Sequence, residues 1–265
     1  MSNILDALAE HARERVFKAQ AMISAEENQH LAYETVGGPA PFAFEKALAT
    51  PGIHFICECK KASPSKGLIA PDFPYLEIAK SYEAAGAAAI SVLTEPKWFL
   101  GSDQYLKEIA DTVTIPCLRK DFTVSDYQIY EAKRLHASAV LLICALLDEE
   151  TIRSYIEICD KLGLSALVEA HDEEEVKAAV RAGARIIGVN NRNLKDFTVD
   201  IHNSVRLREK VPPEVLFVAE SGIKTREDVA VLEDGHVNAV LIGETFMRAA
   251  DKKAMLNELR GGDSF

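Results

Sequence analysis

The stretch "AVLLICALLDEETIRSYIEICDKLGLSALVEA", residues 139–170, contains one complete copy of a unit that is repeated along most of the chain. An apolar run at 139–145 leads into a segment that starts with acidic residues, carries apolar residues at helical spacing and ends at Gly163, and a second apolar run follows at 165–170. Continuous apolar runs are typical of parallel strands that helices cover, and glycine often follows a helix end. The stretch therefore predicts a strand, a helix and a second strand parallel to the first.

The same unit recurs from about residue 53 to the end of the chain. The apolar runs fall at 53–60, 88–94, 115–121, 139–145, 165–170, 185–190, 215–221 and 239–244. Amphipathic segments lie between them; one begins at Ser125, a good helix N-cap, and others end at Gly86, Gly183 and Gly235. This alternation predicts a closed (β/α)8 barrel. An open doubly wound sheet is the alternative, but it usually has six strands, and no GxGxxG follows the first run.

The first 50 residues do not follow the repeat. The segments "ILDALAEHARERVFKAQ" and "PFAFEKALA" predict extra helices before the first strand. Such helices either cap one end of the barrel or close over a ligand, and the sequence leaves both readings open. We expect residues 1–265 to form a single barrel domain, with 1–50 as its helical N-terminal extension.

The composition excludes several classes of partner. The net charge of −11 argues against a nucleic-acid surface and against an anionic membrane, no apolar run approaches the roughly 18 residues of a membrane span, and the N-terminus lacks the apolar core of a secretory signal. Five cysteines without framework-like spacing fit a reducing cytoplasm. Cys57 and Cys59 resemble a metal pair, but no His or Cys cluster follows them, and buried inert thiols are the simpler interpretation.

Ionisable residues stand at the ends of the predicted strands, where the active site of such a barrel is built. Residues two apart on a strand share a face, so Glu58 and Lys60 should point inward, as should Lys120 and Glu169 at the ends of two further strands. More polar side chains follow the later strands: Asn190, Arg192, Glu220, Ser221 and Glu244. Two lysines at the same end of the barrel lower each other's pKa, whereas nearby carboxylates raise the pKa of both. The sequence does not show which of these two effects is larger.

A phosphate site is predicted in the loops after the last two strands. "ESGI" (220–223) and "LIGETF" (241–246) place Gly222 and Gly243 there, where barrels often bind phosphate through backbone N–H groups. Ser63, in the loop after the first strand, could add a donor from the opposite side. The carboxylate of Glu244 would have to point away from the phosphate, although its backbone N–H could donate. Alternatively, Gly222 and Gly243 are ordinary turn glycines that bind no phosphate.

Taken together, "CECKKASPSKG", "LTEPKWFLGS", "LRKDF", "LVEAH", "GVNNRNL", "AESGI" and "LIGETFM" resemble the indole-3-glycerol-phosphate synthase family, in collinear order from about residue 54 to 247. The resemblance implies that 1-(2-carboxyphenylamino)-1-deoxyribulose 5-phosphate is converted to indole-3-glycerol phosphate, carbon dioxide and water, in tryptophan biosynthesis. It also implies a monomer that needs no metal or organic cofactor.

The resemblance further implies roles for individual residues. Lys120 matches the family's essential lysine and is the candidate general acid for ring closure. Lys60 and Arg192 match positions near the substrate carboxylate. Glu169 is the acid–base candidate for the dehydration, with Glu58 and Lys60 as its partners.

The remaining roles concern binding and orientation. Asn190 and Ser221 would orient hydroxyls, and Glu220 would contact the substrate. The apolar pocket for the anthranilate ring would consist of Phe99, Phe122 and Leu141, for which barrel packing is the plainer reading. For His171, beside Glu169, a structural role is favoured over that of a base.

Two other functions compete. A phosphoribosylanthranilate isomerase would rely on an acid–base pair such as Cys and Asp and would lack the inward lysine of "LRKDF". A barrel kept only as a scaffold should have lost its charged strand ends, which are present here.

Overall fold

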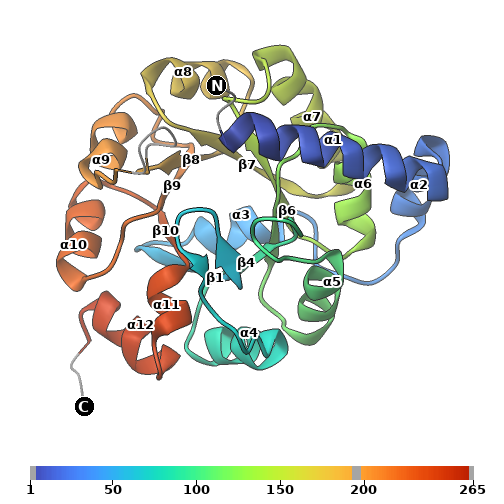
Figure 1. Ribbon diagram of the computed structural model, residues 1–265. Coiled ribbons are helices and arrows are strands. Elements are labelled where there is room, and N and C mark those ends of the chain that lie inside the picture. The colour runs from blue at the N-terminus through green and yellow to red at the C-terminus, as the bar shows by residue number, and fades with distance from the viewer. Residues whose placement is uncertain (1–3, 193–197, 263–265) are drawn as a thin grey trace.

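The computed structural model of the protein describes residues 4–192 and 198–262. Within these residues, eight parallel strands close into a barrel in the order β1-β10-β9-β8-β7-β6-β5-β4, and β4 pairs with β1 to complete the ring (Figure 1). The strands are β1 (His54–Cys59), β4 (Ala89–Leu93), β5 (Cys117–Lys120), β6 (Ala139–Ile143), β7 (Ser165–Ala170), β8 (Ile186–Asn190), β9 (Leu216–Glu220) and β10 (Ala239–Ile242). The predicted (β/α)8 barrel is confirmed.

Helices surround the barrel, and a small hairpin follows its first strand. The helices are α1 (Ile4–Met22), α2 (Ala25–Glu34), α3 (Ala43–Leu48), α4 (Tyr75–Ala84), α5 (Asp103–Thr112), α6 (Tyr127–Arg134), α7 (Glu149–Leu162), α8 (Glu173–Arg181), α9 (His202–Arg208), α10 (Arg226–Asp234), α11 (Glu244–Arg248) and α12 (Lys252–Arg260). The hairpin pairs β2 (Ala62–Ser63) with β3 (Gly67–Leu68) in antiparallel orientation.

Local signals in the sequence explain most of the element bounds. Helix α7 begins where Asp148 accepts a hydrogen bond from the N–H of Thr151, and it ends at Gly163 in the left-handed region. Helix α6 begins two residues after the expected cap: Asp126 is the N-cap, and the Ser125 hydroxyl accepts the N–H of Tyr127 instead. Strand β5 starts later than the predicted run because Pro116 has no N–H to donate to a neighbouring strand.

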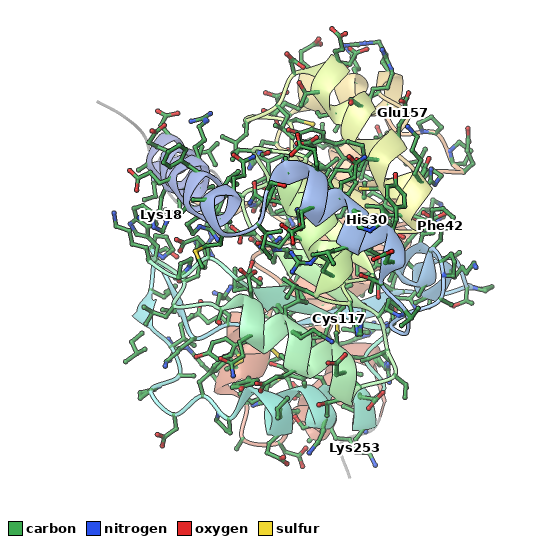
Figure 2. The ribbon with its side chains drawn as sticks, turned by 90° about the vertical axis from the view of Figure 1, so that its right-hand side faces the viewer. Lys18, His30, Phe42, Cys117, Glu157 and Lys253 are labelled. Atoms are coloured by element: carbon green, nitrogen blue, oxygen red, sulfur yellow. The ribbon has the colours of Figure 1, made fainter. Side chains whose placement is uncertain are left out.

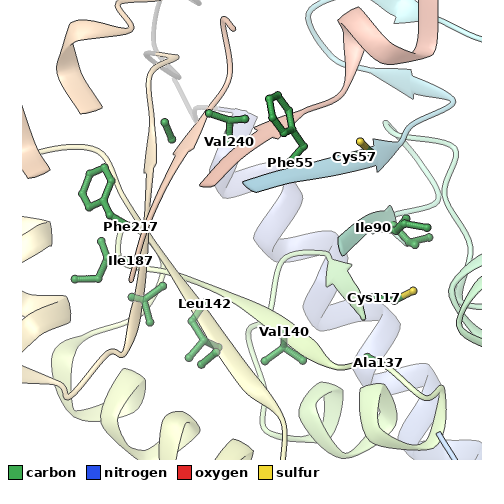
Figure 3. Close-up of a cluster of buried hydrophobic side chains, with 14 of the residues drawn as sticks. Phe55, Cys57, Ile90, Cys117, Ala137, Val140, Leu142, Ile187, Phe217 and Val240 are labelled. Carbon is green, nitrogen blue, oxygen red and sulfur yellow. The ribbon is translucent and has the colours of Figure 1, made fainter. Parts of the chain in front are cut away.

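Alternate residues of each strand enter two separate cores. Phe55, Cys57 and Cys59 of β1 face outward into the layer between strands and helices, as Figure 3 shows for the first two, whereas Ile56 faces the barrel interior. Leu118 of β5 joins the same inner core. The predicted alternation of inward and outward residues along the strands is therefore confirmed. The thiols of Cys57 and Cys59 lie buried among apolar side chains.

Helices from the N-terminal extension lie at both ends of the barrel. Helix α1 crosses the face that is turned toward the viewer in Figure 1, and Figure 2 places Lys18 of α1 and Phe42, which precedes α3, on opposite sides of the molecule. Phe44 and Leu48 of α3 are fully buried against the inner core. Helix α3 thus caps one end of the barrel, whereas the closing of α1 over a ligand at the other end stays a prediction. Helix α2, which the sequence did not reveal as a separate element, packs on α6.

Candidate active site

A cavity of about 510 Å³ opens at the carboxyl ends of the strands. Its volume lies in the range of small-molecule sites, about 300–1,000 Å³. The structure brings every site residue that the sequence suggested to the wall of this cavity: Glu58, Lys60, Ser63, Phe99, Lys120, Phe122, Leu141, Glu169, Asn190, Arg192, Glu220, Ser221, Gly222, Gly243 and Glu244. The last two residues of the motif "GVNNRNL", 193–194, lie outside the described residues. The roles of the lining residues remain predictions.

Lys120 lies between two buried carboxyl groups, those of Glu169 and Glu220. Its Nζ is 3.4 Å from Oε2 of Glu169 and 3.5 Å from Oε2 of Glu220. Burial by itself would lower the pKa of Lys120, but the charges of Glu169, Glu220 and Glu58 outweigh burial and raise the pKa above its usual value. The sequence did not show whether the pKa of this lysine is raised or lowered, and in the structure the acidic neighbours raise it. Lys120 is therefore an ammonium group at neutral pH.

Glu169 is held as a carboxylate. Burial favours its neutral form, but Lys120, His171 and the side chain of Asn190 together lower the pKa of Glu169. Asn190 Nδ2 donates to Oε1 of Glu169 at 3.5 Å, and the Asn190 side-chain oxygen accepts the N–H of Arg192 at 3.0 Å. Asn190 therefore links the end of β8 to the carboxylate at the end of β7.

His171 contacts carboxylates on both of its ring nitrogens. Nδ1 lies 3.1 Å from Oε2 of Glu175, which also accepts the backbone N–H of His171 at 2.7 Å, and Nε2 lies 3.5 Å from Oε1 of Glu169. Burial lowers the pKa of His171, yet the hydrogen bond to Glu175 and the neighbouring carboxylates raise it overall. These contacts support the structural role that was favoured from the sequence.

Glu58 and Lys60 form an ion pair against Gly243. Both side chains are largely buried, and their charged atoms are in direct contact. A Cβ at Gly243 would collide with Oε1 of Glu58 and would lie 2.8 Å from Nζ of Lys60. A side chain at 243 would therefore displace the charged ends of Glu58 and Lys60, in addition to any effect on a phosphate.

The apolar side of the cavity combines loops of the barrel with α1. The rings of Phe99 and Phe122 lie 6.1 Å apart at an angle of 40°. Three residues of α1 that the sequence analysis did not single out complete this wall: Ile4, Leu5 and Leu8. Their helical spacing was visible in the sequence, but nothing local indicated which end of the barrel they would cover.

Helix α1 is fixed to the barrel by two buried carboxylates. Arg15 donates two hydrogen bonds to Asp121, at 2.6 and 3.0 Å, and Nδ1 of His11 lies 3.0 Å from Oε1 of Glu95. Asp121 directly follows Lys120 in the chain. Glu95 in turn accepts the backbone N–H groups of 97–99, at 2.7 to 3.0 Å, and so shapes the loop that carries Phe99.

The predicted phosphate loops contain backbone in the left-handed region. Ser221 has φ 69° and Gly222 has φ 86°, and a non-glycine residue held there is uncommon and often marks a functional site. Beside them, Glu244 pairs with Arg248 at 3.1 Å and with Lys66 at 3.7 Å. Lys66 and Arg248 line the cavity and were missed from the sequence; the i,i+4 spacing of Glu244 and Arg248 was the available signal.

The fold and the site define a (β/α)8-barrel enzyme with paired lysine and carboxylate groups at the carboxyl ends of its strands. The chain belongs to the indole-3-glycerol phosphate synthase family, whose model matches residues 5–259. It is 59% identical over 258 residues to the indole-3-glycerol phosphate synthase of Ruminiclostridium cellulolyticum, covering 97% of this chain and 99% of that protein. It is 52% identical over 261 residues to that of Leuconostoc mesenteroides, with coverage of 97% and 99%.

Solved structures of more distant proteins share the fold. A 3-hexulose-6-phosphate synthase from Salmonella typhimurium superimposes with a TM-score of 0.65 at 15% identity, covering 79% of this chain and 97% of that chain. A thiamine phosphate pyrophosphorylase from Pyrococcus furiosus gives a TM-score of 0.57 at 16% identity, with coverage of 79% and 94%. At this identity the likeness shows the fold alone.

Proposed function

We propose that the protein closes the indole ring of 1-(2-carboxyphenylamino)-1-deoxyribulose 5-phosphate, releasing carbon dioxide and water and forming indole-3-glycerol phosphate in tryptophan biosynthesis. Membership of the family supports the reaction. The observation that carries the mechanism is the position of Lys120, an ammonium group in the cavity wall between Glu169 and Glu220.

In the first step, the ring carbon that bears the carboxylate attacks the ketone carbon of the sugar chain. The carbonyl oxygen gains negative charge as the new carbon–carbon bond forms, and Lys120 transfers a proton to it. Proton transfer by a positioned side chain contributes about 10²–10⁴-fold to a rate. The raised pKa of Lys120 supports this role, because it keeps the proton in place until the oxygen becomes basic.

In the second step, the carboxylate leaves as carbon dioxide and its bonding electrons restore the ring. Lys60 and Arg192, both in the cavity wall, would hold the carboxylate before that step. In the third step, the hydroxyl made by ring closure departs as water while a proton is lost from the new ring. Glu169 is the acid–base group there, and Glu58 with Lys60 forms its partner pair.

The remaining contacts of the substrate follow from the cavity wall. The anthranilate ring would lie against Phe99, Phe122 and Leu141, and the phosphate near Ser63, Gly222 and Gly243. The carboxylate of Glu244 pairs with Arg248 and Lys66, which offsets its negative charge near a phosphate. The reaction loses only carbon dioxide and water and is redox-neutral, so its balance needs no redox cofactor.

Two further properties are part of the proposal. We expect the protein to act as a monomer, as the resemblance to the family implies. All five cysteines are free thiols, which supports a reducing compartment such as the cytoplasm. None of the helices in residues 4–192 and 198–262 is long and apolar enough to cross a membrane.

The decisive experiment incubates the purified protein with the carboxyphenylamino substrate and follows indole fluorescence. We expect a rise in fluorescence with release of one carbon dioxide per product. A parallel incubation with phosphoribosylanthranilate should leave that compound unchanged. Isomerisation in the second assay, or no fluorescence in the first at high protein concentration, would reject the proposed function.

A further inference from the structure

Glu220 is the carboxyl group of the cavity wall with the fewest compensating partners. Glu58 is paired with Lys60. Glu169 has Lys120, His171 and the amide of Asn190. Among the described residues, the one ion pair of Glu220 is with Lys120, which it shares with Glu169, through Oε2 at 3.5 Å.

The other carboxyl oxygen of Glu220 is buried without a hydrogen bond. Glu220 is only 2% exposed, and its Oε1 has no hydrogen-bond partner in the part of the chain that the structure describes. Oε1 lies beside Gly188 of β8, where a Cβ would collide with it. An ionised carboxylate with one bare oxygen is costly to bury, and protonation removes most of that cost.

The surrounding charges favour the neutral form of Glu220. Burial is the largest effect and raises the pKa of Glu220; Lys120 lowers it, Glu169 and Glu58 raise it further and His171 lowers it, for a result of about 8. Lys60 lines the same cavity, but it is paired with Glu58. The neighbouring strands add no charge at this level, because β8 pairs Asn190 with Glu220 and β10 pairs Leu241 with it.

We propose that Glu220 works as a neutral carboxylic acid that donates a hydrogen bond from its carboxyl group to a hydroxyl group of the bound sugar phosphate. This inference rests on the proposed function and deepens it by assigning a protonation state. It has a second consequence for Lys120. With Glu220 neutral, the ammonium group of Lys120 faces one carboxylate at close range instead of two, so it gives up its proton to the substrate more readily.

The same substitution at each of the two carboxyl groups beside Lys120 gives a matched pair of tests. In Glu220→Gln, the amide mimics a neutral carboxyl group and can still donate a hydrogen bond. We expect this variant to keep kcat/KM within about tenfold at pH 7. Glu169→Gln makes the same change at nearly the same distance from Lys120, but it removes a group that works as a carboxylate. We expect it to lose about 10²–10⁴-fold at every pH.

The pH profile separates a proton-carrying role from a merely structural one. In the unmodified protein, kcat/KM should fall as the pH rises through about 8, because Glu220 then loses its proton. Glu220→Gln has no proton to lose at this site and should lack that decline. A loss of activity in Glu220→Gln as large as that in Glu169→Gln, or an unchanged alkaline decline, would overturn the proposal.

A titration by carbon-13 NMR of glutamate carboxyl groups gives a readout that needs no catalysis. We expect one carboxyl carbon of the unmodified protein to titrate near pH 8, and its signal to be missing in Glu220→Gln. If no carboxyl group titrates above pH 7, the inference is wrong even if the enzyme is active. If the signal is present and the protein lacks synthase activity, only the proposed function fails. The unmodified protein alone supplies this test, so poor folding of a variant would not remove it.

Discussion

At the amino ends of the strands, α3 closes the barrel by burying Phe44 and Leu48 against the inner core. At the carboxyl ends, α1 is instead held by His11 and Arg15 on two buried carboxylates, and it leaves a cavity beneath it. Both helices come from the same N-terminal extension. The difference shows that one end is built for stability, through apolar packing that requires no charge, whereas the other keeps ionisable groups that require partners.

The sharpest test of this difference between the two ends is to remove Lys120, at the carboxyl ends of the strands. We expect Lys120→Met to lower kcat by at least about 10²–10⁴-fold, because the acid for ring closure is gone, while product still binds. The measurement is the initial rate of indole fluorescence, with product affinity from calorimetry. Lys80→Met is the matched control, since Lys80 is exposed on α4 and pairs only with Glu77 in the described structure. A near-normal rate in Lys120→Met would refute the assignment of the acid.

At the amino ends of the strands, we expect a substitution to change stability and not catalysis. Phe44→Ala should reduce the free energy of unfolding by about 3–5 kcal/mol, since it empties a fully buried site, and it should leave kcat unchanged at temperatures where the variant is folded. Urea unfolding and the fluorescence assay measure the two quantities. Phe17→Ala on α1 is the control, because the Phe17 side chain is 75% exposed. A large loss of kcat in folded Phe44→Ala would show that the two ends are not independent.

The smallest of the three effects concerns the attachment of α1. Arg15→Met leaves the buried Asp121 without its two hydrogen bonds from α1, which should cost about 1–3 kcal/mol. We expect KM to rise more than kcat falls, because Ile4, Leu5 and Leu8 would no longer be held in the cavity wall.

Steady-state kinetics and urea unfolding test this effect against Arg13→Met. Arg13 is exposed, and its ion pair is with Glu10 of the same helix, so its removal should change stability by less than about 1 kcal/mol. Equal behaviour of the two variants would mean that the Arg15–Asp121 contact does not position the cavity wall.

The parts of the molecule that the sequence predicted well are those that depend on local periodicity. The two-residue repeat of a strand places Ile56 and Glu58 on one face and Cys57 on the other, whatever the rest of the chain does. Applied to several strands, the same rule brought Lys120 and Glu169 to one cavity. The left-handed cap at Gly163 was equally local.

The features that the sequence did not reveal depend on contacts between distant segments. The position of α1 follows from pairs that are 84 and 106 residues apart, and no local pattern marks Glu95 or Asp121 as their partners. The pKa of Lys120 depends on three carboxylates from three strands, so its direction required their distances. The space that Gly188 leaves for Glu220 is likewise a property of two neighbouring strands.

The long separation between α1 and its anchors also has a consequence for how the protein is made. Helix α1 leaves the ribosome before Glu95 and Asp121, which follow 84 and 106 residues after their partners in α1, so α1 cannot dock fully until the first three of the eight strands have been synthesised. Contacts of such high sequence separation form late and slowly, because a long loop must be closed before they contribute. Until then, the side chains of α1 that are buried in the folded protein, such as Leu5 and Leu8, have no barrel to pack against.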